Sequence, residues 1–302
     1  MNDAIIFRPG TTADAYTAFC LFEETFADLS RRMGNPEPTS WSDPAQLAAM
    51  WEKRRGLYEH LAATAEQYWI AEQGNKPVGF ARSIRRGSVR QLTEFFVLPD
   101  VQSSHIGREL LARAFPVEGA THRLIIATTD LRAQVRYLKA GVFPRFPIYY
   151  FGRPPEAVTV DTDLTFVVVK TEDDVALLGN IDEVVLGFRR QSDHRWLLTN
   201  RQGYLYYRDN RPMGYGYIGR TNGPFALLDS ADYPAVLAHA EKEAAKAGRT
   251  HFGMEVPMAN EIAVTYLLQR GFRMDSFITY WMCDRLFGKP ENYIITSPPF
   301  FL

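Results

Sequence analysis

Cysteine is scarce in this chain of 302 residues, with Cys20 and Cys283 far apart and no CxxC pair. This spacing excludes a disulfide framework and favours a reducing, cytoplasmic setting. The six histidines form no pair at i, i+4 or HxH spacing, so no metal is expected. No apolar run approaches the roughly 20 residues that a membrane-spanning helix needs. The first residues also lack the pattern of a signal peptide, and we expect no membrane partner.

An excess of charge of one sign is also missing, because 34 basic residues nearly balance 35 acidic ones. No Lys/Arg-rich run or basic stripe with interleaved aromatics is present, so nucleic acid is not an expected partner. No G-x-S-x-G elbow supports a serine hydrolase. What is abundant is hydrophobic sequence, 46% of the chain with 13% aromatics. At this length that composition can fill two cores, and two domains are expected.

An internal repeat supports this expectation. Residues 75–81 and 210–216 both read as a tight turn that enters a strand, and a strand, a helix and a closing glycine follow in each half. The repeated motifs occur in the same order in both halves, which predicts a duplication. Prolines 154 and 155 interrupt the pattern, so we expect an N-terminal domain over 1–155 and a C-terminal domain over 156–302.

The hydrophobic periodicity predicts an α/β protein in which helices follow strands of a mixed sheet. In the first half we expect strands at 4–8, 67–72, 77–82, 91–98, 124–128 and 148–151, and helices at 14–33, 44–66, 106–115 and 131–139. In the second half we expect strands at 166–170, 203–208, 213–219, 225–228, 251–256 and 278–283, and helices at 233–247 and before Gly271.

Residues 95–111 hold the most informative pattern, a strand followed at once by a polar loop and a helix. The start of a helix exposes backbone N–H groups and the positive end of the helix dipole, so such a loop can hold a pyrophosphate. Gly107 would allow close backbone approach. The alternative is purely structural, with Ser103 or Ser104 capping the helix.

This stretch resembles the acyl-CoA motif of the GNAT superfamily of N-acetyltransferases. Val97, Pro99, Gln102 and Gly107 match its Val-x-Pro and Gln-x-x-Gly-x-Gly pattern, and residues 106–111 match the helix that follows. His105 stands in place of the first glycine. The resemblance implies two tandem GNAT-like domains, each with a mixed, mostly antiparallel sheet flanked by helices.

The resemblance also implies acetyl-CoA as co-substrate in the N-terminal copy. The end of the strand would pair with the pantetheine arm, and backbone groups of the loop would hold the pyrophosphate. The strand residues are alternatively plain buried positions, and both interpretations can hold together. The implied contacts are Phe96, Val97 and Leu98 for pantetheine, and Gln102, Ser103, Ser104, His105, Ile106, Gly107 and Arg108 for pyrophosphate.

Acetyl transfer from a thioester to an amine requires a general base and a general acid. Strand alternation places Glu94 on one face with Leu92 and Phe96, where apolar neighbours would raise its pKa. Members of the superfamily often carry their base on this strand; the alternative is a Glu that reaches solvent or pairs with an arginine such as Arg90. Tyr137, four residues before Gly141, matches the position of the usual acid and is otherwise a core residue. The carboxylate of Leu302 is a further candidate base, because in some tandem members the terminal carboxylate takes this role.

The second copy departs from the motif, because residues 229–234 contain two acids and no glycine. Carboxylates at a helix start compete with phosphate, so we expect this copy to have lost CoA binding. Its expected role is to complete the acceptor pocket or to support a dimer. We therefore expect the protein to be an N-acetyltransferase, monomeric or homodimeric. In the expected reaction, a primary amine of a small molecule or a peptide attacks the thioester of acetyl-CoA directly. A non-catalytic CoA-binding sensor or scaffold is the alternative. Aromatic residues that could line the acceptor pocket are Phe22, Phe26, Trp41 and Trp51.

Overall fold

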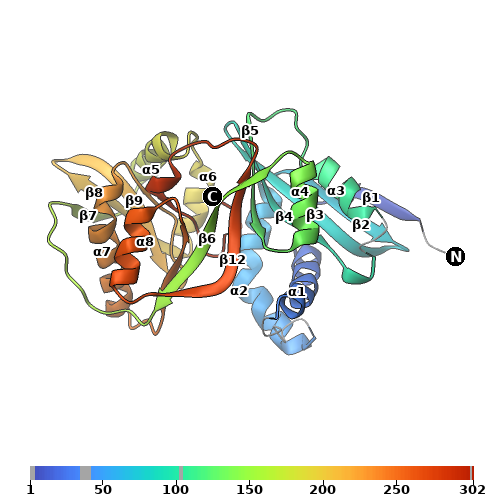
Figure 1. The fold of residues 1–302 in the computed structure, drawn as a ribbon, viewed down its shortest axis with the longest axis horizontal. Helices are drawn as coiled ribbons and strands as arrows, with labels where there is room; N and C mark the ends of the chain where they lie inside the picture. The colour runs from blue at the N-terminus through green and yellow to red at the C-terminus, as the bar shows by residue number, and fades with distance from the viewer. Residues whose placement is uncertain (1–3, 35–41, 102–104, 300) are drawn as a thin grey trace. The chain divides into compact units, whose positions relative to one another are not determined.

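The computed structural model describes residues 4–34, 42–101, 105–299 and 301–302. The chain divides into two compact units (Figure 1). Unit 1 contains residues 1–125 and 130–140, and unit 2 contains residues 126–129 and 141–302. In the described part of the chain, no helix is long and apolar enough to cross a membrane.

Unit 1 is built on strands in the order β1-β2-β3-β4-β5. Neighbouring strands are antiparallel except β4 and β5, which are parallel. The expected elements are all present, although α2 ends at residue 63, earlier than expected, because β2 begins at residue 65. The bounds are β1 Ile5–Pro9, α1 Ala15–Arg32, α2 Pro44–Ala63, β2 Ala65–Gln73, β3 Lys76–Arg86, β4 Val89–Val97, α3 Ile106–Ala114, β5 His122–Thr128 and α4 Leu131–Lys139, with short 3-10 turns at Thr12–Asp14 and Pro99–Val101.

Alternation along β4 shows which helices cover each face of this sheet. Phe96 packs edge-on against Phe22 of α1, with ring centroids 5.1 Å apart. Its neighbour Phe95 points the other way and packs against Tyr137 of α4 at 6.1 Å. Helices α1 and α2 therefore lie on one face, and α4 lies on the other. The fully buried core of unit 1 includes Phe19, Ile70, Phe80, Leu110 and Leu124.

Unit 2 contains two groups of strands. Strand β6 pairs antiparallel with β11 on one side and with β12 on the other, and a second sheet has the order β13-β10-β9-β8-β7. The sequence did not predict α5, α6 or β13. The bounds are β6 Phe143–Arg153, β7 Thr165–Val168, α5 Glu172–Val185, α6 Gln191–Leu198, β8 Arg201–Arg208, β9 Arg211–Gly219, β10 Phe225–Leu227, α7 Tyr233–Lys246, β11 Phe252–Pro257, α8 Glu261–Gln269, β12 Arg273–Cys283 and β13 Tyr293–Ile294, with 3-10 turns at Ser230–Asp232 and Pro290–Asn292.

The order of elements confirms the duplication. The series β1-α1-α2-β2-β3-β4-α3-β5-α4-β6 is followed by β7-α5-α6-β8-β9-β10-α7-β11-α8-β12. This correspondence equates β4 with β10 and β5 with β11. Among the described residues, β13 has no counterpart in the first series. The domain limits 1–155 and 156–302 remain a prediction, since packing places residues 141–153 with unit 2.

The two hairpins that carry the sequence repeat are also alike in detail. Gly74 and Asn75 join β2 to β3 with φ of 55° and 62°, and Asp209 and Asn210 join β8 to β9 with φ of 48° and 61°. Two central residues with positive φ form the hairpin turn whose twist matches that of the strands. Each hairpin has a register shift close to this turn. The repeated Asn-x-Pro motif thus encodes the same turn and bulge twice.

Candidate active site

Strand β4 changes its pairing part-way along. It pairs with β3 as far as Val97, whereas its parallel pairing with β5 runs from Val89 to Leu92 and ends there. A register shift on the β3 side falls at the same point, between Leu92 and Glu94. Such a bulge bends and twists a strand locally and often lies beside an active site. The second half of β4 holds Glu94, Phe96 and Val97, and it lies beyond the region paired with β5.

Glu94 lies on the face of β4 that is covered by α1 and α2, and it is 2% exposed. Its Oε2 accepts a hydrogen bond of 2.7 Å from Nε of Arg82 on β3 and a second from Nη2 of the same guanidinium. Arg82 is itself fully buried and donates to the backbone oxygen of Tyr58 on α2 at 3.2 Å. The guanidinium also lies 5.0 Å from the centre of the Tyr68 ring. Glu94 is therefore half of a buried ion pair.

The alternative expectation for Glu94, a pair with an arginine, is confirmed, but the arginine is not Arg90. Arg90 binds Glu66 of β2 instead, with distances of 2.6 and 2.8 Å. The partner, Arg82, sits within the apolar run of β3, directly opposite Glu94 in the register. Opposite charges facing each other in the middle of two apolar strands are the sequence signal that would have identified this pair.

Two opposing effects act on the Glu94 carboxyl. Burial raises its pKa, and the charge and hydrogen bonds of Arg82 lower it, with a net upward shift. The upward direction is the one expected from the sequence. Among the described residues, its second oxygen, Oε1, has no hydrogen-bond partner although it is buried. A buried acceptor without a donor costs free energy, and a catalytic role is one physical reason for such an atom.

Tyr137 lies on the opposite face of β4. Helix α4 begins after Asp130, whose carboxylate accepts a 3.0 Å hydrogen bond from the N–H of Arg132. Tyr137 is buried against Phe95. Burial, followed by the negative charge of Asp130, raises its pKa far above the ordinary value of 10.0. The phenol therefore holds its proton at neutral pH, so Tyr137 is a candidate proton donor rather than a base. The fold thus places the two acid–base candidates on opposite sides of the same strand.

The predicted phosphate loop is described in part. Gln102, Ser103 and Ser104 lie outside the described residues, and so does the proposed serine cap. His105 is the N-cap of α3 and has a left-handed backbone, with φ of 65° and ψ of −3°. Its carbonyl accepts hydrogen bonds from the N–H groups of Arg108 and Glu109 at 3.0 and 3.2 Å. The left-handed conformation gives a physical reason for the glycine that the motif carries here, since glycine adopts it without strain.

Gly107 is buried in the first turn of α3, and its small size has a clear packing role. A Cβ atom at this position would lie 3.2 Å from Cζ of Phe95 and 3.4 Å from Nε of Arg136. The glycine therefore lets α3 approach both β4 and α4. It also brings the Arg136 guanidinium beside the start of α3. Arg136, which the sequence analysis did not single out, could hold a phosphate there together with the backbone N–H groups.

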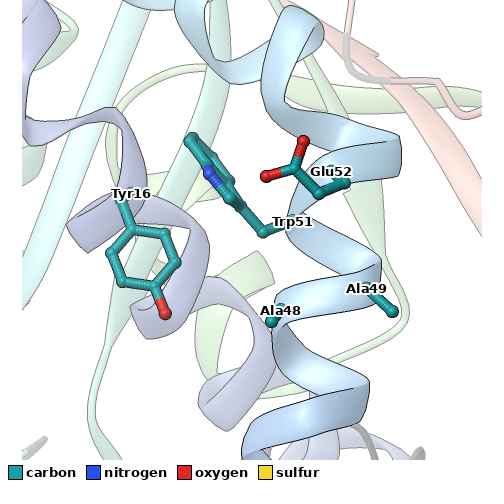
Figure 2. A pocket seen from close by; sticks show the side chains of 5 residues that line it. All are labelled: Tyr16, Ala48, Ala49, Trp51 and Glu52. Carbon is teal, nitrogen blue, oxygen red and sulfur yellow. The ribbon is translucent and has the colours of Figure 1, made fainter.

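A groove runs between α1 and α2. It has a volume of about 440 Å³ and is lined by Tyr16, Ala48, Ala49, Trp51 and Glu52. Figure 2 shows Tyr16 reaching from α1 toward these residues of α2. The Tyr16 and Trp51 rings meet edge-on at 5.1 Å. Four aromatic residues were expected around an acceptor pocket, and one of them, Trp51, lines this groove. The rings of Phe22 and Phe26 stack on each other, with centroids 5.4 Å apart. Trp41 lies outside the described residues.

The corresponding loop of the second copy has its helix start occupied by carboxylates. Asp229 accepts a 2.9 Å hydrogen bond from the N–H of Ala231. Asp232, the N-cap of α7, binds Arg208 at 2.7 Å. The loss of CoA binding by this copy stays a prediction, and these contacts give its physical reason. Among the described residues, no cluster of three His, Cys, Asp or Glu side chains could hold a metal ion.

Comparison with known proteins shows what one part of the chain resembles. Residues 64–141 match the acetyltransferase (GNAT) domain family. These residues span β2 to α4 and therefore contain Arg82, Glu94, the predicted phosphate loop and Tyr137. No curated protein sequence matches the chain.

Solved structures extend this likeness to the whole fold. A Pyrococcus horikoshii protein assigned as an acetyltransferase has a TM-score of 0.71 at 14% identity, covering 96% of this chain and 92% of its own. A GCN5-related N-acetyltransferase from Sphaerobacter thermophilus has a TM-score of 0.58 at 14% identity, covering 94% and 96%. A tandem GNAT protein from the clavulanic acid biosynthesis pathway has a TM-score of 0.57 at 13% identity, covering 93% and 98%. At these identities the likeness is one of fold, shared over more than 90% of the chain with structures of acetyltransferases, including a tandem GNAT protein.

Proposed function

We propose that this protein is an N-acetyltransferase that moves the acetyl group of acetyl-CoA to a primary amine by direct attack in a ternary complex. The N-terminal copy, residues 1–155, carries the reaction, and the C-terminal copy, residues 156–302, does not bind the cofactor. One observation carries the proposal. The pairing of β4 with β5 ends at Leu92, two residues before the buried carboxylate of Glu94 and ahead of the start of α3 at Ile106.

The residues around β4 fit acetyl-CoA. The backbone of Phe96, Val97 and Leu98 would pair with the amide groups of the pantetheine arm as a further strand. The N–H groups at the start of α3, together with Arg136 and Arg108, would hold the pyrophosphate. When bound, the cofactor supplies a thioester, whose carbonyl carbon is the electrophile. Everything else in the reaction is done by the chain's own groups.

Three proton transfers are needed. Glu94, with its raised pKa, would take a proton from the acceptor ammonium, so that the nitrogen lone pair can form the new C–N bond. The Tyr137 hydroxyl would donate its proton to the sulfur as the C–S bond breaks. The nitrogen, which still carries one proton more than the amide product, would release that proton, and this restores the Tyr137 hydroxyl.

The groove between α1 and α2 suggests the chemistry of the acceptor. The Tyr16 and Trp51 rings offer an aromatic wall that attracts both apolar groups and cations, and Glu52 adds a negative charge. A primary amine with an apolar or aromatic portion, in a small molecule or a peptide, fits these walls.

The test is titration calorimetry with acetyl-CoA, followed by release of the CoA thiol in the presence of a panel of amines. Gly107→Glu should abolish binding, because it adds charge and bulk at the phosphate loop. Gly107→Ala is the matched control for packing, since it adds only the Cβ beside Phe95. Both variants need a native melting temperature for the comparison to count. An unmodified chain without affinity for acetyl-CoA would overturn the proposal.

A non-catalytic CoA sensor is the second candidate, and the commitment of Glu94 Oε2 to Arg82 favours it. A carboxylate held by a guanidinium is a weaker base than a free one. Binding of acetyl-CoA without thiol release in the presence of any amine would support the sensor.

A further inference from the structure

The C-terminal segment, which means residues 292–299 and 301–302, contributes a strand to the middle of unit 2. Strand β13 pairs antiparallel with β10, with Ile294 opposite Phe225 and Tyr293 opposite Ala226. The next residue, Ile295, forms an antiparallel bridge to Glu255 of β11. The segment therefore lies between β10 and β11 and pairs with both.

This place has a defined counterpart in the first copy. The order of elements equates β10 with β4 and β11 with β5. In the first copy the pairing between these two strands ends at Leu92, which leaves the rest of β4 to pair with another extended chain. In the second copy a strand of the protein itself takes this position.

Side chains of unit 2 hold the segment from both sides. The Asn292 amide donates to the backbone oxygen of Leu227 on β10 at 2.7 Å. The Asn260 amide donates to the oxygen of Tyr293 at 3.3 Å. Tyr293, Ile294 and Ile295 are fully buried. Specific hydrogen bonds and complete burial together identify a built site rather than a loosely packed tail.

Arg201 of β8 ties down the next part of the segment. Its guanidinium is buried and donates to Oγ1 of Thr296 at 2.8 Å and to the oxygen of Ser297 at 2.9 Å. Burial lowers the pKa of Arg201 to about 10. A buried guanidinium cation is costly, so each acceptor that it binds contributes to stability. Further along, Phe301 packs edge-on against Trp196 of α6 at 5.6 Å. Removing the segment would leave a buried cation with fewer acceptors and would expose apolar surface.

We propose that unit 2 is a strand-binding module whose ligand is the C-terminal segment of the same chain, and that this segment excludes acyl-CoA from the second copy. Extended backbone between β10 and β11 satisfies the strand edges that a pantetheine arm would otherwise use. Asp229 and Asp232 lie at the start of α7, where their carboxylates would repel the pyrophosphate of acyl-CoA. A peptide strand between β10 and β11 carries no phosphate and is compatible with these carboxylates. The inference does not depend on acyl transfer by unit 1.

The experiment cuts the chain without removing the segment. A recognition site for a specific protease is inserted between Arg285 and Leu286, which are exposed, and the folded protein is cleaved. We expect the fragment that contains β13 to remain bound through gel filtration and to exchange with an excess of a labelled synthetic peptide of residues 290–302. A peptide with Ile294→Asp is the matched control and should not exchange, because the charge would enter the core. Acetyl-CoA in excess should not displace the fragment.

Two results would overturn the proposal. One is release of the fragment from a unit 2 that stays folded by circular dichroism. The other is displacement of the fragment by acetyl-CoA. Amide hydrogen exchange on the intact chain decides the matter even if the cleaved protein unfolds. The N–H groups of residues 293–295 should exchange as slowly as those of β10, whereas exchange at the rate of an open loop would show that no built site exists.

Discussion

Replacing Glu94 by Gln tests whether the buried ion pair also serves the reaction. The substitution keeps the shape of the side chain and removes its charge. Arg82 then remains as a fully buried cation whose other described contacts are the Tyr58 carbonyl and two aromatic rings. Breaking a buried pair from one side costs about 3–5 kcal/mol, and cation–π contacts offset about 1 kcal/mol of this. Removal of the charge also ends the burial penalty that raises the Glu94 pKa, so we expect the unfolding free energy to fall by about 2 kcal/mol, which lowers the melting temperature by about 4–8 °C.

The same variant should lose activity for a separate reason. Removal of a general base costs about 10²–10⁴-fold in rate, so kcat/KM for the amine should fall within that range. Urea unfolding gives the first quantity, and thiol release from acetyl-CoA gives the second. The matched control is Glu66→Gln, which breaks the more exposed Arg90 pair on the same sheet. Arg90 is itself buried, but it keeps its hydrogen bonds to the carbonyls of Pro116 and Glu118, so this control should cost less, about 1 kcal/mol, and leave the activity unchanged.

Two outcomes would refute this reasoning. Equal destabilisation by Glu94→Gln and Glu66→Gln would show that the charge of Glu94 is not buried as the structure has it. Strong destabilisation by Glu94→Gln with unchanged kcat/KM would leave the ion pair intact as a structural feature and remove Glu94 as the base.

Three further substitutions test other parts of the protein. Tyr137→Phe keeps the packing on Phe95 and removes the proton donor, so kcat should fall about 10²-fold at an unchanged melting temperature; a normal kcat would dismiss the acid role. His105→Gly relieves a left-handed backbone and should raise stability by about 1 kcal/mol without weakening acetyl-CoA binding in calorimetry; a less stable variant would contradict the strain argument. Burial, followed by repulsion from Asp275, raises the pKa of Glu255 from 4.5 to about 7. Since this pKa is raised, the stability contributed by the protonated carboxyl is present below pH 4.5 and lost as the pH rises through about 7. Glu255→Gln should therefore be more stable than the parent by about 2–3 kcal/mol at pH 8 and little different at pH 4.5, as urea midpoints would show.

Local patterns in the sequence predicted much of unit 1 because the chemistry there is encoded by neighbouring residues. The β4, loop and α3 succession follows from an apolar alternation, a proline and helical spacing within residues 95–111. The direction of the Glu94 pKa shift followed from its apolar neighbours. The identity of its partner did not, since Arg82 reaches it through the register of a hairpin rather than through sequence distance.

Helices α5 and α6 were missed for different reasons. The buried side of α6 is largely polar, with Asp193 and His194 beside Leu197, so hydrophobic periodicity is weak there. Asp182 of α5 is also buried; its Oδ2 accepts from Arg190 at 2.7 Å and lies 2.8 Å from Nε2 of His194. The rest of the buried side of α5 is apolar at helical spacing, with Val175, Leu178, Ile181 and Val185, so the sequence did contain the signal for this helix.

The sequence by itself determined the duplication, the order of strands and helices in unit 1, and the strand, loop and helix motif of residues 95–111. These features depend on short-range patterns and turn chemistry, which act between residues a few positions apart. Only the tertiary structure decided that the pairing of β4 with β5 ends at Leu92, that Glu94 forms an ion pair with Arg82, and that residues 293–295 pair with both β10 and β11. Each of these features depends on pairing between segments that are distant in sequence. Such pairing is stabilising only when both partners are buried together, so that the hydrogen bonds and ion pairs offset the loss of hydration.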